Sequence, residues 1–178
     1  MTITNSTIHS IRAGFGRRIF LPCLAIVASL FALPASAAGD EITGRAAVID
    51  GDTIIIASHH IRLYAIDAPE KSQLCATGDG AQSACGQEAA DYLREIIGRK
   101  RVSCAPVTPA DQYGRIVARC AVKGQDLGRS MVQAGHALAY RRYGRDYIED
   151  ENQAREQMRG LWAEQFEAPW TWRHKHKD

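Results

Sequence analysis

Short β-branched apolar runs, separated by turn residues, dominate the chain between Arg45 and Ile66. The alternation predicts three strands, over Arg45–Ile49, Thr53–Ala57 and Ile61–Ile66, because turns containing glycine or paired histidines interrupt the runs. Three consecutive twisted strands form a meander, and such a meander curls readily into a small barrel. The first part of the domain is therefore expected to be β-structure.

The hydrophobic period changes after Gly86. Apolar residues then recur at helical spacing up to Ile97, and Gly98 supplies a stop signal. Two further strands are expected over Arg101–Pro106 and Arg115–Val122, on either side of a turn-rich segment. This half of the pattern predicts one helix followed by a hairpin.

Two more helices are predicted near the C-terminus. Asp126 can cap a helix over Leu127–Ala134, and an extended segment, Ala137–Tyr143, leads to a helix from Tyr147 to about Gly160. The polar segment from Pro169 to Lys177 predicts no element and is expected to be frayed and solvated. The whole order predicts an α+β, mainly β fold: a five-stranded oligonucleotide/oligosaccharide-binding (OB) barrel with three helices.

The N-terminal segment has the pattern of a secretory signal peptide. Three arginines precede the apolar run Ile19–Leu33, which ends in the small-residue sequence Pro34-Ala35-Ser36-Ala37-Ala38. The alternative is a membrane anchor, but 15 apolar residues are fewer than the roughly 20 that a spanning helix needs. We expect residues 1–38 to be removed on export and the protein to be periplasmic or secreted, without membrane attachment.

Removing the leader changes the charge balance. All 20 acidic residues follow residue 38, whereas three of the 22 basic residues precede it, which leaves 19 against 20 and a net charge of −1. A protein that coats DNA carries a basic stripe. Contact with nucleic acid is therefore expected to be local and transient, and no stable protein partner or oligomer is implied.

Four cysteines follow the leader, and an even number in an exported domain favours disulfides over free thiols. Three connectivities are possible. We favour Cys75–Cys85, which closes a loop, and Cys104–Cys120, which would bridge the predicted hairpin symmetrically about Gln112.

Four carboxylates and a guanidinium gather around the predicted turns: Asp50, Asp52, Arg62, Asp67 and Glu70. Carboxylate oxygens are hard ligands that suit Ca²⁺. Zinc is disfavoured, because the cysteines are expected to form disulfides and no histidine pair has ligand spacing on a helix. Turn formation and capping are the alternative role for such aspartates. One difficulty is that strict alternation places Arg62 and Asp67 on opposite faces, unless the strand bends or ends before Asp67.

An ordered set of short motifs resembles the staphylococcal nuclease (thermonuclease) family. The resemblance extends from Arg45 to Trp162 and implies a nuclease domain over residues 39–165 and a polar tail over 166–178. The motifs are Asp50-Gly-Asp52-Thr53, Arg62-Leu-x-x-Ile-Asp67-x-Pro-Glu70, Gly86-x-Glu-Ala, Asp111-x-Tyr113-Gly114-Arg115 and Gly160-Leu161-Trp162.

The resemblance also implies residue roles. Asp52, Asp67 and the main-chain carbonyl of Ala68 match Ca²⁺ ligands, and Asp50 matches an acidic residue that holds the metal's water. Glu70 matches the residue that orients or deprotonates the attacking water.

Arg62 and Arg115 match the two guanidinium groups that clamp the scissile phosphate. Tyr140 and Tyr143 resemble the aromatic residues of the nucleotide pocket. Tyr113 lies close enough to Arg115 in sequence to bond a phosphate, although it could equally cover the core.

The expected function is an exported Ca²⁺-dependent endonuclease that cleaves DNA and RNA and leaves 3′-phosphate ends. Physical chemistry supports these roles, because planar arginine forks match phosphate oxygens and a divalent ion polarises them. Two alternatives stay open: an inactive OB-fold module that only binds nucleic acid, and a disulfide-stapled protein with structural Ca²⁺. Degenerate relatives would be expected to lose Arg62, Glu70 or Arg115, and all three are present.

Overall fold

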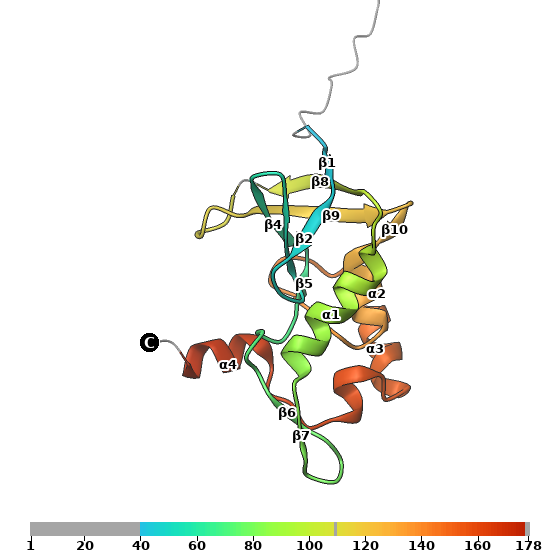
Figure 1. The fold of residues 1–178 in the computed structure, drawn as a ribbon. Coiled ribbons are helices and arrows are strands. Elements are labelled where there is room, and N and C mark those ends of the chain that lie inside the picture. The colour runs from blue at the N-terminus through green and yellow to red at the C-terminus, as the bar shows by residue number, and fades with distance from the viewer. Residues whose placement is uncertain (1–39, 109, 177–178) are drawn as a thin grey trace, which may run out of the picture. The chain divides into compact units, whose positions relative to one another are not determined.

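The structure, a computed structural model, describes residues 40–108 and 110–176, so the predicted leader lies outside the described residues. Those residues form a mixed α+β fold with a mostly sheet core, four α-helices and one 3₁₀ helix (Figure 1). The strands are β1 Ile42–Gly44, β2 Ala46–Val48, β3 Thr53–Ile56, β4 His59–Leu63, β5 Ile66–Asp67, β6 Cys75–Ala76, β7 Gln82–Ser83, β8 Val102–Thr108, β9 Ile116–Val122, β10 Gln125–Asp126 and β11 Leu138–Ala139. The helices are α1 Cys85–Ile97, α2 Leu127–Gln133, α3 Ile148–Glu156, η1 Gly160–Ala163 and α4 Pro169–Lys175.

The main sheet has seven strands in the order β1-β8-β9-β4-β3-β2, with β10 added beside β9. Among the strand pairs of this sheet that the structure describes, only β4–β9 is parallel. The two edges, β1 and β2, are neighbours in sequence and are separated by Arg45, so one bent segment supplies both edges. No pairing within the described part of the chain closes the sheet, and it has seven strands, which differs from the predicted five-stranded barrel. Strand β1, just before Arg45, is an element that the sequence pattern did not predict.

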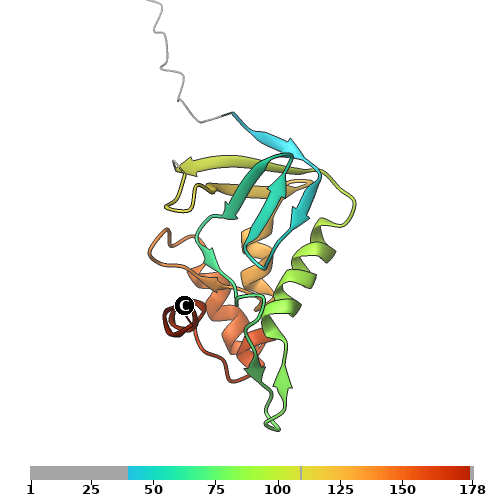
Figure 2. The ribbon, with the colours of Figure 1, turned by 60° about the vertical axis from the view of Figure 1, so that its left-hand side comes forward.

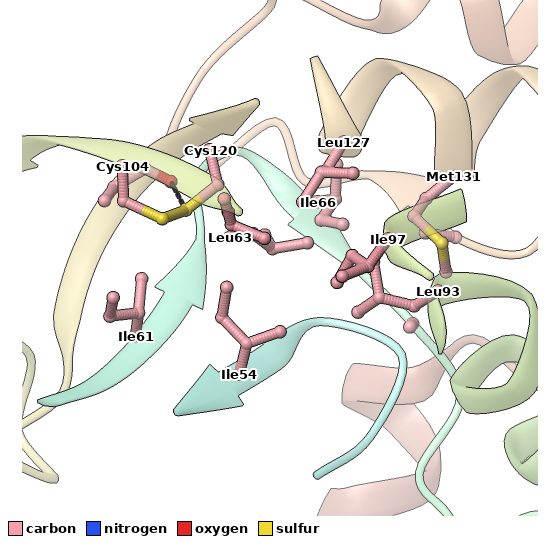
Figure 3. Packing of buried hydrophobic residues seen from close by; sticks show 14 of the residues in the cluster. Ile54, Ile61, Leu63, Ile66, Leu93, Ile97, Cys104, Cys120, Leu127 and Met131 are labelled. Atoms are coloured by element: carbon pink, nitrogen blue, oxygen red, sulfur yellow. Dashed lines mark hydrogen bonds between the residues drawn. A yellow bond between two sulfur atoms is a disulfide. The ribbon is translucent and has the colours of Figure 1, made fainter. Parts of the chain in front are cut away.

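A single apolar cluster joins the sheet to the helices. Ile54, Ile61 and Leu63 of the sheet lie beside the β8–β9 disulfide, and Leu93 and Met131 bring α1 and α2 against the same core (Figure 3). The isoleucines and leucine are almost wholly buried. This cluster fixes the strand ends that carry the acidic residues.

The first two helices agree with the sequence pattern. Helix α1 stops at Gly98, whose positive φ of 55° suits a glycine. The carboxylate of Asp126 accepts a hydrogen bond from the Arg129 N–H and so caps α2. The predicted helix boundaries there are confirmed to within two residues.

The third predicted helix is wrong at its C-terminal end. Helix α3 ends at Glu156, Met158 has a positive φ of 52°, and the chain resumes as the 3₁₀ helix η1. A left-handed residue cannot continue an α-helix. The expected extended segment Ala137–Tyr143 is a strand only at β11, and its last three residues, Arg141–Tyr143, form a turn.

A fourth helix, α4, forms where the sequence predicts no element, so the expected count of three helices is wrong. Pro169 occupies its first turn, which suits the fixed φ of proline. Its remaining stabilisation comes from contacts with distant parts of the chain rather than from apolar periodicity. None of the helices in the described ranges is long and apolar enough to span a membrane.

Both expected disulfides are present. Cys75–Cys85 ties the segment that carries the small hairpin of β6 and β7, which extends away from the main sheet (Figure 2). Cys104 and Cys120 face each other in the antiparallel β8–β9 register, as the symmetric spacing predicts.

Candidate active site

A sharp turn between strands β4 and β5 brings Arg62 and Asp67 together. Strand β4 ends at Leu63, and Ala65 has a φ of 56°, in the left-handed region, before β5 begins. The Arg62 Nη2 atom then donates to Asp67 Oδ1 at 2.7 Å and to the Ile66 carbonyl at 3.1 Å. The strand therefore ends before Asp67, as the two side chains require if they share one site.

The turn before β3 presents Asp52 to the same guanidinium. The Asp52 main-chain N–H donates to Asp50 Oδ1 at 3.0 Å, and its carbonyl accepts from the Leu63 N–H at 2.8 Å. Arg62 Nη1 donates to Asp52 Oδ1 at 2.6 Å, while Asp52 Oδ2 accepts from the Ala68 N–H at 3.3 Å. One arginine thus holds Asp52 and Asp67 side by side.

Two glycines allow the site loops to pack closely. A Cβ atom at Gly51 would lie 2.6 Å from the Cβ of Ala68, and one at Gly86 would lie 1.7 Å from the carbonyl oxygen of Glu70. Any larger residue at Gly86 must therefore displace the Glu70 main chain from the start of α1. The glycine of the Gly86-x-Glu-Ala motif has a positional role.

Burial makes the acidic cluster electrostatically strained. Asp67 is 0% exposed and Asp52 is 4% exposed. Burial raises the pKa of Asp67, although hydrogen bonds and charge from Arg173 and Arg62 oppose the rise. Burial and the Asp52 carboxylate raise the pKa of Asp50 to about 6. Burial therefore disfavours the charged form of both Asp50 and Asp67.

The charged form of Arg62 is favoured, in contrast to the charged forms of Asp50 and Asp67. Burial disfavours its charged form, but Asp52 and Asp67 outweigh that effect and raise the pKa of the guanidinium. It stays a cation, with its donors aimed at two buried carboxylates.

Arg173 of α4 contacts this cluster and was missed by sequence reasoning. Its Nη1 atom donates to Glu70 Oε1 at 2.7 Å and its Nη2 atom to Asp67 Oδ2 at 2.8 Å. Together with Arg62, it occupies both carboxylate oxygens of Asp67. The segment predicted to be frayed and solvated therefore reaches the centre of the site.

Buried Gln73 links the Glu70 loop to the segment that leads into α4. Its Oε1 atom accepts from the Glu70 N–H at 3.3 Å, and its Nε2 atom donates to the Glu167 carbonyl at 2.7 Å. Gln73 is 0% exposed, so both bonds lie away from solvent. No short motif marks this glutamine, because its partners are almost a hundred residues apart.

Arg115 is oriented by a second acidic residue. Asp111 accepts from Arg115 Nε at 2.9 Å and Nη2 at 2.8 Å, and the same carboxylate accepts main-chain N–H bonds from Tyr113 and Arg115. Arg115 Nη1 also lies 3.3 Å from Thr53 Oγ1. The motif contained Asp111 but gave it no role, and the structure shows it holding the arginine.

The three tyrosines occupy different environments. Tyr113 is 70% exposed and its ring lies 5.3 Å from the Arg115 guanidinium, so it does not cover the core. The Tyr140 N–H donates to the Ala65 carbonyl at 2.8 Å, and Tyr64 Oη donates to the Tyr143 carbonyl at 2.8 Å. These bonds fix the turn that carries Tyr140 and Tyr143 beside the strand break.

One open pocket of about 1120 Å³ collects most of the predicted residues. Its lining includes Arg62, Glu70, Arg115, Tyr113, Tyr140 and Tyr143, together with Arg142, Trp170 and Arg173. Asp50, Asp52, Asp67 and Ala68 do not line it. Asp52 and Asp67 lie behind Arg62, as their burial and their bonds to it indicate.

The carboxylates have the chemistry that a hard divalent ion prefers. Asp52 and Asp67 place four carboxylate oxygens around one guanidinium. In the described ranges, no group of three or more histidine, cysteine, aspartate or glutamate side chains is already arranged around a common point for a metal.

Residues 60–164 match the family described as staphylococcal nuclease homologue. The chain belongs to the staphylococcal nuclease family. The matched segment contains Arg62, Asp67, Glu70 and Arg115, whereas Asp50, Asp52 and all of α4 lie outside it.

Several proteins are similar to this chain, and two of those described here are named as nucleases. An uncharacterized endonuclease of Escherichia coli is 35% identical over 159 residues, covering 84% of this chain and 95% of that protein. A micrococcal nuclease of Shigella flexneri is 32% identical over 149 residues, covering 74% and 79%. A succinoglycan biosynthesis protein, ExoI, of Rhizobium meliloti is 36% identical over 115 residues, and the chain spans only 60% of its length.

Proposed function

We propose that this protein is an exported, Ca²⁺-dependent endonuclease that hydrolyses phosphodiester bonds of DNA and RNA and leaves 3′-phosphate ends. The observation that carries the proposal is a single pocket lined by Arg62, Glu70 and Arg115, with Asp52 and Asp67 buried against Arg62. Family membership and relatives named endonuclease and micrococcal nuclease support it.

Each residue has a distinct chemical task in such a reaction. Arg62 and Arg115 would present planar N–H donors to the phosphate oxygens, on which negative charge grows as the bond is cleaved. Both Nη atoms of Arg62 now donate to Asp52 and Asp67, so phosphate binding would replace or share some of these bonds. Asp111 keeps the Arg115 fork oriented toward the pocket. Glu70, at the pocket wall, accepts a proton from the attacking water or orients it.

Asp52 and Asp67, with the Ala68 carbonyl, would hold Ca²⁺, and Asp50 would support them from behind. When bound, the ion would polarise the phosphate oxygens and balance the developing charge. Ca²⁺ would need carboxylate oxygens that are already hydrogen-bonded, because both oxygens of Asp67 accept from Arg62 and Arg173. The ion would therefore replace at least one of those hydrogen bonds.

The residues that face the pocket support a broad range of nucleic-acid substrates. Tyr140 and Tyr143 present aromatic rings, which stack on any nucleobase, and arginines contact phosphates without reading sequence. Export is supported by the basic, apolar and small-residue pattern of residues 1–38. The two disulfides are also consistent with export, because disulfides form and persist in oxidising compartments.

A cleavage assay tests the proposal. The protein is incubated with plasmid, single-stranded DNA and RNA, in Ca²⁺ or in chelator, beside Arg115→Ala and the control Arg99→Ala, an exposed arginine outside the pocket. We expect Ca²⁺-dependent fragmentation of all three substrates, loss in Arg115→Ala, and 3′-phosphate ends that block extension until a phosphatase removes them. The absence of Ca²⁺-dependent cleavage by the unaltered protein would leave a binding module or a structural Ca²⁺ protein.

A further inference from the structure

Helix α4 lies beyond the family match and adds an aromatic residue to the pocket wall. The match ends at residue 164, and α4 begins at Pro169. Trp170 of this helix stacks on Tyr140, with ring centroids 5.8 Å apart and an interplanar angle of 29°. Trp170 is nevertheless 39% exposed, so much of its indole remains available to a ligand.

A side pocket of about 380 Å³ opens beside this aromatic pair. Ala139, Tyr140, Arg141, Arg142 and Trp170 line it. Three of these residues, Tyr140, Arg142 and Trp170, also line the larger pocket that holds Glu70 and Arg115. The side pocket therefore adjoins the proposed site of phosphodiester cleavage.

The two arginines of the side pocket differ in their hydrogen bonds and ion pairs. Arg141 donates to buried Glu151 at 2.6 Å and to the Ala139 carbonyl at 3.3 Å, which fixes its position. Arg142 is exposed, and no other described residue forms an ion pair or hydrogen bond with its guanidinium. A free cation beside an aromatic pair suits a nucleotide, whose base can stack while its phosphate meets the charge.

Polar contacts that do not involve Trp170 also anchor α4. Arg173 of the same helix bonds Glu70 and Asp67, and Gln73 bonds the Glu167 carbonyl just before it. Lys175 pairs with Glu167 as well. With the helix held by these polar contacts, the exposure of a large aromatic residue at the pocket edge calls for another explanation.

We propose that Trp170 and Arg142 form a subsite for a neighbouring nucleotide of a single-stranded substrate, the base lying against Trp170 and its phosphate against Arg142. This inference rests on the proposed nuclease function and extends it to α4, outside the matched domain. Stacking on an indole tolerates every base, so the subsite adds affinity for single strands without sequence preference. A paired base inside a duplex cannot enter it.

Binding in chelator, where Ca²⁺-dependent cleavage is blocked, tests the subsite. A short fluorescein-labelled oligothymidylate is titrated by fluorescence anisotropy with the protein and with Trp170→Ala, Trp170→Phe and Trp172→Ala. Trp172 is the matched control, because it lies on the same helix and stacks on His176 instead. We expect about tenfold or more weakening in Trp170→Ala, at least partial recovery in Trp170→Phe, and little change in Trp172→Ala.

A scan with single abasic positions separates base stacking from a general effect on α4. In the unaltered protein, one abasic position should weaken binding as strongly as Trp170→Ala does, and in Trp170→Ala that position should have little further effect. Arg142→Gln should reduce the slope of log affinity against log salt by about 0.7, one phosphate contact to a single strand, whereas Arg99→Gln should not.

The two hypotheses fail differently. Equal sensitivity to every abasic position, equal loss in Trp170→Ala and Trp172→Ala, or no oligonucleotide binding overturns the subsite. The cleavage assay in Ca²⁺ decides the nuclease function separately. A protein that cleaves but shows no base-dependent contribution from Trp170 keeps the proposed function and loses this inference.

Discussion

Replacing Arg173 should strengthen Ca²⁺ binding, because its guanidinium occupies carboxylate oxygens that an ion would need. Arg173 Nη2 lies 2.8 Å from Asp67 Oδ2, and Arg62 already takes the other oxygen of Asp67. Arg173→Gln removes the positive charge and keeps a polar side chain. The substitution therefore frees one oxygen of a proposed ligand and lowers the repulsion that an arriving cation meets.

The expected size follows from the geometry and exposure. Two unit charges about 4 Å apart interact by about 4 kcal/mol at an effective dielectric constant of 20. The Arg173 side chain is 34% exposed, and solvent screening reduces contributions of this kind to about 1 kcal/mol. We therefore expect Kd for Ca²⁺ to fall by a factor of about five to ten, which corresponds to a gain of roughly 1 to 1.4 kcal/mol in binding free energy.

Isothermal titration calorimetry in metal-free buffer of fixed ionic strength measures this change directly. Lys175→Gln is the matched control, because it removes the same charge from the same helix but pairs with Glu167 rather than with the acidic cluster. Unfolding temperatures of both variants in chelator show whether α4 and the fold are retained. Equal or weaker Ca²⁺ affinity in Arg173→Gln, relative to the unaltered protein, would refute the reasoning.

Three further outcomes are expected. Gly86→Ala should displace the adjoining site loop and lower cleavage at least tenfold, whereas Gly78→Ala, where a Cβ meets nothing within 4 Å, should not. Replacing Cys104 and Cys120 by alanine should lower the free energy of unfolding by about 3 kcal/mol in urea titrations, since the disulfide closes a loop with a sequence separation of 16. Burial lowers the pKa of His136, so the unfolded chain binds its proton more tightly and stability falls as pH drops below 6.5. His136→Phe keeps an aromatic ring and should flatten the dependence of Tm on pH in that range; an unchanged slope would contradict the assignment.

Local pattern was sufficient for the elements whose causes are local. The helix that ends at Gly98 and the helix capped by Asp126 follow from periodicity and capping, and both form as expected. The Cys104–Cys120 pair follows from hairpin symmetry and is present. In each case, a few neighbouring residues determine the structure.

The site was predictable as a set of residues but not as a geometry. Strict strand alternation over Ile61–Ile66 would place the side chains of Arg62 and Asp67 on opposite faces. They meet because the strand is interrupted at Ala65, which has a left-handed conformation. Alanine rarely adopts this conformation by itself, so surrounding packing must impose it. The local sequence around Ala65 therefore does not specify that turn.

Helix α4 was unpredictable for a related reason. Its sequence has little apolar periodicity, and its contacts from Arg173 reach Asp67 and Glu70 more than a hundred residues earlier. Its position therefore depends on a site that must already be folded. The same holds for Gln73, whose two partners lie at Glu70 and Glu167.

The most direct test of the nuclease assignment is the rate at which Glu70→Gln cleaves a labelled single-stranded DNA in Ca²⁺. The control is Glu156→Gln, an exposed glutamate at the end of α3. If Glu70 activates or orients the attacking water, its replacement should slow cleavage by roughly 100-fold or more, while the control stays within about twofold. An equal rate in Glu70→Gln and the unaltered protein, or cleavage that persists in chelator, would contradict the assignment of this pocket as a Ca²⁺-dependent active site.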